Sequence, residues 1–207
     1  MKIVITGANS ATGQAILRCA PKAGVEPNAL VAAVRSDAAA DEIRPLLADG
    51  SLAIVSYGDP SSLDAAFRGA SAVIHLAGIL VERSGSTYEQ ANVAPIRGVV
   101  EAAQRCRVEK FVLVSATGAD EKSPNAYYRS KGQGEAIVRA SGLRYTILRA
   151  PLLLGPGTEG AATLARNACG PRARLIGGGR NFQQPLDVDD LAQAALAAVR
   201  PAGACHR

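Results

Sequence analysis

The sequence predicts an α/β fold in which a doubly wound parallel sheet is covered by helices on both faces. Short apolar runs alternate along the chain with longer segments of helical periodicity. The first run, Ile3–Ile5, is too short for a helix and passes through a turn of small residues into one. Right-handed crossovers turn such an alternation into a parallel sheet with helices on both sides.

Each expected element rests on a local signal. Asp59-Pro60 is typical of a helix start, and Ser141-Gly142 of a helix stop. We expect strands at Ile3–Ile5, Ala29–Val34, Leu52–Val55, Ala72–Gly78, Lys110–Ser115 and Tyr145–Leu148, with a short one at Arg174–Ile176. We expect helices at Gln14–Ala20, Ala38–Asp49, Asp59–Gly69, Thr87–Arg105, Ala126–Ala140, Thr158–Ala168 and Asp187–Arg200, and an unstructured end at Pro201–Arg207.

Length and composition bound the function. A chain of 207 residues supports one domain, so we expect a single unit over 1–207, in which about 151–186 form a minimal substrate cap. The net charge of +5 is scattered over arginines without interleaved aromatics, so we expect no nucleic-acid partner. The four cysteines form no CxxC motif, and we expect no metal site. No apolar run is long enough to span a bilayer and no signal peptide is evident, so we expect a cytoplasmic protein without a membrane partner.

The turn at Thr6–Gly13 is the first candidate site. Gly7 allows a sharp turn, and Gly13 allows the helix to pack closely on the strand. Free N–H groups at the start of the helix would point at a pyrophosphate. A plain tight turn is the alternative. The cofactor-binding candidates here are Gly7, Asn9, Ser10, Ala11, Thr12 and Gly13.

The end of the second strand bears on cofactor choice. An acidic residue there binds the 2′-hydroxyl of NAD, whereas an arginine accommodates the 2′-phosphate of NADP. The first polar residue is Arg35, which favours NADP(H). Asp37 lies two residues on, so NAD(H) is the alternative.

Ligands of such sheets bind beyond the carboxyl ends of the strands. Ala77 and Gly78 lie at one such end, and Ser115 and Thr117 at the next. The loop at 79–86 is a candidate lid. His75, inside an apolar run, is expected to be a packed imidazole rather than a catalyst.

Tyr127 and Lys131 form the candidate catalytic pair. They are four residues apart and share one helix face. A nearby ammonium is expected to lower the pKa of the phenol, which then exchanges a proton with a substrate oxygen while a nicotinamide exchanges a hydride. Ser115 or Thr117 is expected to hydrogen-bond the same oxygen. The alternative is that Tyr127 and Lys131 lie on an ordinary solvated helix face and have no catalytic role.

These motifs together resemble the short-chain dehydrogenase/reductase superfamily, in its extended or atypical branch of NmrA-like proteins and relatives of an accessory subunit of respiratory complex I. The resemblance covers nearly the whole chain. It rests on Thr6–Gly13, His75–Gly78, Asn92-Val93, Tyr127–Lys131, Tyr145–Arg149 with Gly155–Gly157, and Gln184–Asp190.

The resemblance implies a Rossmann fold and an NAD(P)(H)-dependent oxidoreductase or epimerase acting on a small carbonyl or hydroxyl compound. Tyr127 would be the acid/base, Lys131 its activator and a ribose contact, and Ala150 and Pro151 cofactor contacts. Ser10 replaces a family glycine, so its Cβ is expected to crowd the backbone approach to the pyrophosphate, although its hydroxyl could donate to a phosphate. Ala116 replaces a family serine. Some relatives bind a dinucleotide without turnover, so a redox sensor or assembly protein with a protein partner or as a homodimer is the alternative.

Overall fold

Six parallel strands form the central sheet of the computed structural model, which describes residues 1–169, 179–180 and 182–200. The strands are β1 (Ile3–Thr6), β2 (Leu30–Val34), β3 (Ser51–Ile54), β4 (Ala72–His75), β5 (Lys110–Ala116) and β6 (Tyr145–Ala150). Their order is β3-β2-β1-β4-β5-β6, with every neighbouring pair parallel. The order reverses between β1 and β4, and ligands of such sheets bind outside the strand ends at that point.

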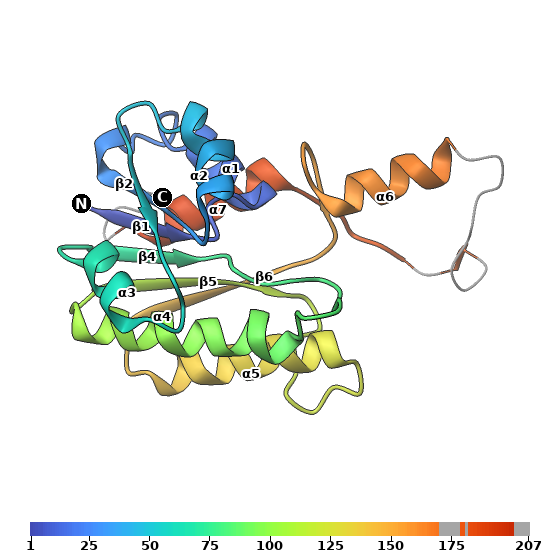
Figure 1. The fold of residues 1–207 in the computed structure, drawn as a ribbon. Helices are drawn as coiled ribbons and strands as arrows, with labels where there is room; N and C mark the ends of the chain where they lie inside the picture. The colour runs from blue at the N-terminus through green and yellow to red at the C-terminus, as the bar shows by residue number, and fades with distance from the viewer. Residues whose placement is uncertain (170–178, 181, 201–207) are drawn as a thin grey trace.

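Helices cover both faces of the sheet, which confirms the predicted doubly wound architecture (Figure 1). One face carries α1 (Ala11–Cys19), α2 (Asp37–Ile43) and α7 (Val188–Ala198), and the other carries α3 (Pro60–Phe67), α4 (Ala94–Arg105) and α5 (Ala126–Ala140). Successive strand residues point to opposite faces. Ile3 and Ile5 therefore pack in the first layer and Val4 in the second, all of them fully buried.

Two helices differ from expectation at their starts. α1 begins at Ala11 rather than Gln14, because the Ser10 side chain caps it by accepting from the Gly13 N–H at 3.1 Å. A turn of π-helix, Glu89–Val93, precedes α4, where Pro95 has no N–H to donate. The sequence predicts a cap for this helix at Thr87 or Ser86, and the structure shows it at Thr87, since Thr87 and Gln90 exchange hydrogen bonds between side chain and backbone.

The chain leaves the sheet after β6 to form a small outlying unit. β7 (Leu153–Leu154) pairs in parallel with β8 (Leu186–Asp187), and α6 (Glu159–Ala168) projects away from the sheet (Figure 1). None of the residues of α6 is buried. The predicted strand Arg174–Ile176 and the end at Pro201–Arg207 lie outside the described residues. Within the described part of the chain, no helix combines the length and apolar character needed to cross a bilayer.

Candidate active site

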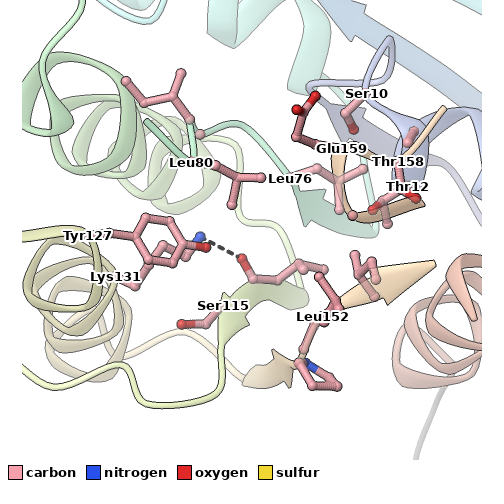
Figure 2. A pocket seen from close by; sticks show the side chains of 18 of the residues that line it. Ser10, Thr12, Leu76, Leu80, Ser115, Tyr127, Lys131, Leu152, Thr158 and Glu159 are labelled. Atoms are coloured by element: carbon pink, nitrogen blue, oxygen red, sulfur yellow. Dashed lines mark hydrogen bonds between the residues drawn. The ribbon is translucent and has the colours of Figure 1, made fainter. Parts of the chain in front are cut away.

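A cavity of about 340 Å³ opens at the carboxyl ends of β1, β4, β5 and β6 (Figure 2). Nine of the residues predicted from the sequence as site residues line it. They are Ser10, Ala11, Thr12, Gly78, Ser115, Tyr127, Lys131, Ala150 and Pro151. The structure therefore brings the first turn of α1 and the Tyr–Lys pair of α5, far apart in the chain, to one cavity.

Six other predicted residues are not part of the cavity wall: Gly7, Asn9, Gly13, Arg35, Ala77 and Thr117. Gly7 and Gly13 shape the turn through their backbones. Gly7 has φ +75°, and a Cβ there would lie 2.9 Å from the Ala77 nitrogen. A Cβ on Gly13 would lie 2.4 Å from the Ala8 oxygen, so only glycine allows α1 to approach this closely.

The first turn of α1 has the construction of an anion site. The Ser10 side chain accepts a hydrogen bond from the Gly13 N–H. The backbone N–H groups of Ala11 and Thr12, at the N-terminal end of the helix, have no acceptor within the helix. These residues line the cavity, where the positive end of the helix dipole favours a phosphate. The backbone at this end therefore fits a dinucleotide diphosphate. Ser10 acts in this structure as the helix cap rather than as the phosphate donor expected from the sequence.

Arg35 and Thr117 lie outside the cavity, just beyond the carboxyl ends of β2 and β5. Arg35 directly follows β2 and is exposed, beside the Ser36 cap of α2. Thr117 is also exposed, and its hydroxyl donates to the Arg149 carbonyl at 3.4 Å. Of the two hydroxyl candidates at the carboxyl end of β5, only Ser115 therefore lines the cavity.

Lys131 is buried, and its ammonium donates to the Val114 carbonyl oxygen at 3.0 Å (Figure 2). Burial lowers the pKa of this lysine to about 8, although the nearby Glu135 carboxylate opposes the shift. At neutral pH the side chain still carries its charge. The cavity thus holds an ammonium fixed by a backbone carbonyl.

Tyr127 faces the same cavity, but its pKa moves opposite to the sequence-based expectation. Burial raises the pKa to about 12, and Tyr128 and Tyr88 add to the rise. The ring of Tyr127 lies 5.4 Å from that of Tyr128 and 5.9 Å from that of Tyr88. In this structure the Lys131 ammonium, bound to Val114, does not offset these effects. The phenol is therefore protonated at neutral pH and suited to donating a proton.

Ser115 lies beneath this pair at the end of β5, with its side chain directed toward α5 (Figure 2). Its hydroxyl is buried and makes no hydrogen bond of good geometry within the described residues. It lies near enough to the Glu135 carboxylate, however, to contribute to lowering the pKa of that group. Ser115 is thus a buried polar group in the wall of the cavity.

Glu135, which the sequence reading passed over, is fully buried one helical turn after Lys131. Its carboxylate accepts from Arg149 at 2.9 and 2.7 Å and from Arg139 at 2.6 Å. Burial alone would raise the pKa of Glu135, but hydrogen bonds from Arg149, Ser115 and Arg139 outweigh burial and lower it. The i,i+4 spacing from Lys131 is the signal that places Glu135 on the same helix face.

Asn92 holds the wall between β4 and α4. It is buried in the π-helical turn, and its Oδ1 accepts from the Ile79 N–H at 2.7 Å. Its Nδ2 donates to the Ile79 carbonyl at 3.2 Å and to the Ser130 hydroxyl at 2.9 Å. The side chain therefore ties the loop after β4 to α5, the helix that carries Tyr127. π-Helical turns are frequently found at functional sites.

His75 behaves as a packed core residue, as expected, although only one of its ring nitrogens has a partner among the described residues. Its Nδ1 lies 2.7 Å from the Thr6 hydroxyl, and its Nε2 is buried without a hydrogen bond. Burial, with the charge of Lys131, lowers the pKa of His75 to about 3. The imidazole is neutral across the physiological range.

The other residues of the cavity wall were not named individually as site residues from the sequence. They are mainly apolar and small residues that follow β4 and β6: Leu76, Ile79, Leu80, Val114, Leu152, Leu153, Gly157, Thr158, Glu159 and Gly160. Part of the cap expected at about 151–186 does line the cavity, namely residues 151–153 and 157–160.

Comparison with known proteins identifies the family to which the chain is similar. Residues 7–200 match the NAD(P)H-binding protein family. The chain is 33% identical over 157 residues to the ceramide reductase of Caulobacter vibrioides, covering 75% of this chain and 47% of the relative. It is 31% identical over 176 residues to the uncharacterized sugar epimerase YhfK of Bacillus subtilis, covering 78% of each. The chain thus spans about half the length of the first relative.

The fold is also shared with solved structures. The triphenylmethane reductase of Citrobacter, solved with NADP(H), superposes with a TM-score of 0.74 at 22% identity, covering 98% of this chain and 66% of that one. The NADPH-dependent quinone oxidoreductase QOR2 of Escherichia coli, with NADPH, gives a TM-score of 0.73 at 23% identity, covering 97% and 65%. At these identities the likeness concerns the fold.

Proposed function

The chain belongs to the NAD(P)H-binding family, in the atypical branch of the short-chain dehydrogenase/reductase superfamily, and from this premise we propose that it is an NAD(P)(H)-dependent oxidoreductase acting on a small carbonyl or hydroxyl compound. One observation carries the proposal. The open helix end at Ala11 and Thr12 and the side chains of Tyr127 and Lys131 line a single cavity. An epimerase would use the same groups for transient oxidation and reduction.

The proposed role of each cavity residue follows from its position in the cavity. Ala11 and Thr12 would hold the diphosphate through their amides, and Gly78, Ala150 and Pro151 would flank the adjoining part of the dinucleotide. Lys131 would contact the ribose. When bound, the cofactor would supply the hydride for a substrate carbonyl.

Tyr127 completes the reduction with its proton. As the carbonyl carbon gains the hydride, the phenol donates a proton to the carbonyl oxygen, which leaves an alcohol and a phenolate. The phenolate then regains a proton from solvent. Ser115 hydrogen-bonds the same oxygen. Because the pKa of Tyr127 is about 12, the residue is ready for reduction at neutral pH, whereas oxidation would first require its deprotonation.

A charge placed at the helix end tests cofactor binding. Glutamate at the first position of a helix stabilises the helix but repels a phosphate. We expect Ala11→Glu to keep its melting temperature and to weaken NADPH binding at least about tenfold, measured by fluorescence titration. Ala194→Glu, which adds the same charge on an exposed face of α7, should bind like wild type. Equal affinities in Ala11→Glu and wild type would refute the diphosphate site.

Two neighbouring tyrosines test the catalytic assignment. Loss of a proton donor typically costs about a hundredfold or more in rate. We expect Tyr127→Phe to lose turnover by about that factor in a screen of carbonyl compounds while still binding NADPH. Tyr128→Phe, the adjacent and exposed phenol, should keep its rate. Unchanged turnover in Tyr127→Phe would exclude the proposed role.

A non-catalytic redox sensor or assembly protein is the second candidate. Helix α6 projects from the body with no buried residue, and it exposes Leu164, a surface that suits a protein partner. The photosystem II assembly factor Ycf39 of Cyanophora paradoxa is among the relatives, 28% identical over 149 residues. For this candidate, partner binding should depend on the redox state of the nicotinamide and survive Tyr127→Phe. Carbonyl turnover that is lost in Tyr127→Phe would favour the enzyme instead.

A further inference from the structure

The half of the cavity around Tyr127 is apolar. Leu76 and Leu80 line it from the segment after β4, as does Leu152 from the segment after β6 (Figure 2). Leu153 also lines the cavity. These side chains and the tyrosine ring face the same space. A ligand that reaches the phenol must therefore place part of its surface against hydrocarbon.

The wall that carries Leu80 is held in place by hydrogen bonds. The Tyr88 hydroxyl donates to the Leu80 carbonyl at 2.9 Å, and the Tyr88 ring lies 5.9 Å from that of Tyr127. Asn92 binds both backbone groups of Ile79. Leu80 is nevertheless 55% exposed, and the next residue, Val81, is 67% exposed. Apolar surface therefore continues from the cavity to the outside of the protein at a fixed position.

The charges of the cavity oppose an anionic ligand in this half. Lys131 is the one lysine or arginine in the described part of its lining, and its ammonium already binds Val114. The carboxylate of Glu159 also lines the cavity, and its ion pair with Arg166 at 2.8 Å draws that guanidinium away from a ligand. A substrate carboxylate or phosphate in this half would lose its hydration without forming an ion pair with a guanidinium, so its binding would be unfavourable.

We propose that the substrate is a neutral carbonyl compound with an apolar chain or ring that lies along Leu80 and extends past Val81, rather than an anionic keto acid or sugar nucleotide. This inference rests on the proposed function and gives it a substrate class. The carbonyl oxygen would meet Tyr127, and the apolar part would lie against Leu76, Leu152 and Leu153.

The test compares methyl ketones of increasing chain length with α-keto acids of matching length, using the full chain and NADPH. Each buried methylene contributes about 0.8 kcal/mol, so kcat/KM should rise about threefold to fourfold per methylene until the apolar wall is covered. The matching keto acid should be at least about tenfold poorer. A preference for the keto acids, or no dependence on chain length, would overturn the inference.

Two exposed apolar residues provide the matched variants. Leu80→Ser should flatten the chain-length dependence, whereas Ile54→Ser, on β3 and outside the cavity, should retain it. Both side chains are about half exposed, so neither variant removes core packing. An identical chain-length dependence in Leu80→Ser and wild type would refute the apolar path.

A binding measurement keeps the inference testable without turnover. In the presence of NADPH, fatty amides should bind more tightly than the corresponding carboxylates by calorimetry, with affinity rising with chain length. Tighter binding of the carboxylates, or binding of neither series, would refute the substrate class while leaving the dinucleotide site intact. Failure of NADPH itself to bind would refute the proposed function and the inference together.

Discussion

The carboxylate of Glu135 accepts two hydrogen bonds from the guanidinium of Arg149, at 2.9 and 2.7 Å, and thereby joins α5 to β6. Lys131 lies one helical turn before Glu135, and Ala150 directly follows Arg149. Both of these neighbours line the cavity. The ion pair therefore fixes the distance between two opposite walls of the candidate site.

Glu135→Gln is expected to lower the free energy of unfolding by about 1–3 kcal/mol at neutral pH, because it weakens charge-assisted hydrogen bonds of a buried group. The two arginines are about half exposed and can be solvated, so the loss should stay below that of a fully buried pair. Urea unfolding measures the effect. Glu89→Gln, in an exposed pair with Arg97, should cost less than about 1 kcal/mol.

The same pair predicts a pH dependence. The pKa of Glu135 is lowered in the folded state, so its contribution to stability is present above its unfolded pKa, near 4.5. That contribution should disappear as the pH falls through the folded pKa. The difference in stability between wild type and Glu135→Gln should therefore shrink on acidification below about pH 4.5. A constant difference down to strongly acidic pH would contradict this assignment.

Lys131→Met is expected to stabilise the fold while abolishing activity. The lysine is buried with its pKa lowered from 10.5 to about 8, so between these values the unfolded chain binds more protons than the folded one. Stability of the wild type should therefore rise with pH across that window. Methionine avoids the cost of a buried charge, and we expect a gain of about 1–3 kcal/mol at pH 7 and a flatter pH profile.

Lys122→Met is the matched control, because Lys122 is exposed. Its stability should follow the wild-type pH profile. Thermal melts from pH 7 to 11 would compare the three proteins. A Lys131→Met protein less stable than wild type at pH 7 would show that the Val114 hydrogen bond outweighs the burial of the charge.

Asn92→Ala is expected to loosen the wall over the phenol. It leaves the Ile79 N–H and carbonyl without the side chain that binds them, which typically costs about 1–3 kcal/mol. We expect faster amide hydrogen exchange at Ile79 and Leu80 and a fall in turnover, with NADPH binding less affected. Asn28→Ala, at an exposed position, should change none of these. Unaltered exchange in Asn92→Ala would rule out this anchoring role.

The sheet and most helices could be predicted from the sequence because buried parallel strands give continuous apolar runs and helix ends have their own residue types. Asp59 before Pro60 marked α3 correctly, and Ala126–Ala140 was predicted to the residue. The start of α1 was missed because Ser10 lies among small residues that favour a turn as much as a cap. The pairing of β7 with β8 involves two residues per strand, too few to show a pattern.

Site residues that need a particular chemical group could be predicted from the sequence, whereas residues that contribute only to the shape of the cavity could not. The spacing of Tyr127 and Lys131 was visible, but the pKa of the phenol depends first on its burial in the folded chain, and then on the neighbouring Tyr128 and Tyr88. Similarly, Ser115 and Thr117 were equivalent candidates, because residues two apart share one face of a strand. The structure distinguishes them, since β5 ends at Ala116 and only Ser115 lines the cavity. Leu80 and Leu152 carry no signal beyond their position after a strand.

Arg35 gives the last prediction, on cofactor choice. It is exposed directly after β2, at the strand end where the adenosine ribose binds in this fold. A guanidinium that binds a 2′-phosphate contributes about 1.5–3 kcal/mol, so Arg35→Ala should weaken NADPH binding about tenfold to hundredfold. NADH lacks the phosphate, and its affinity should change little. Arg44→Ala, in an exposed ion pair with Asp41, should leave both affinities unchanged. If Arg35→Ala weakens NADH and NADPH equally, Arg35 does not discriminate between them, and Asp37 becomes the residue to examine in its place.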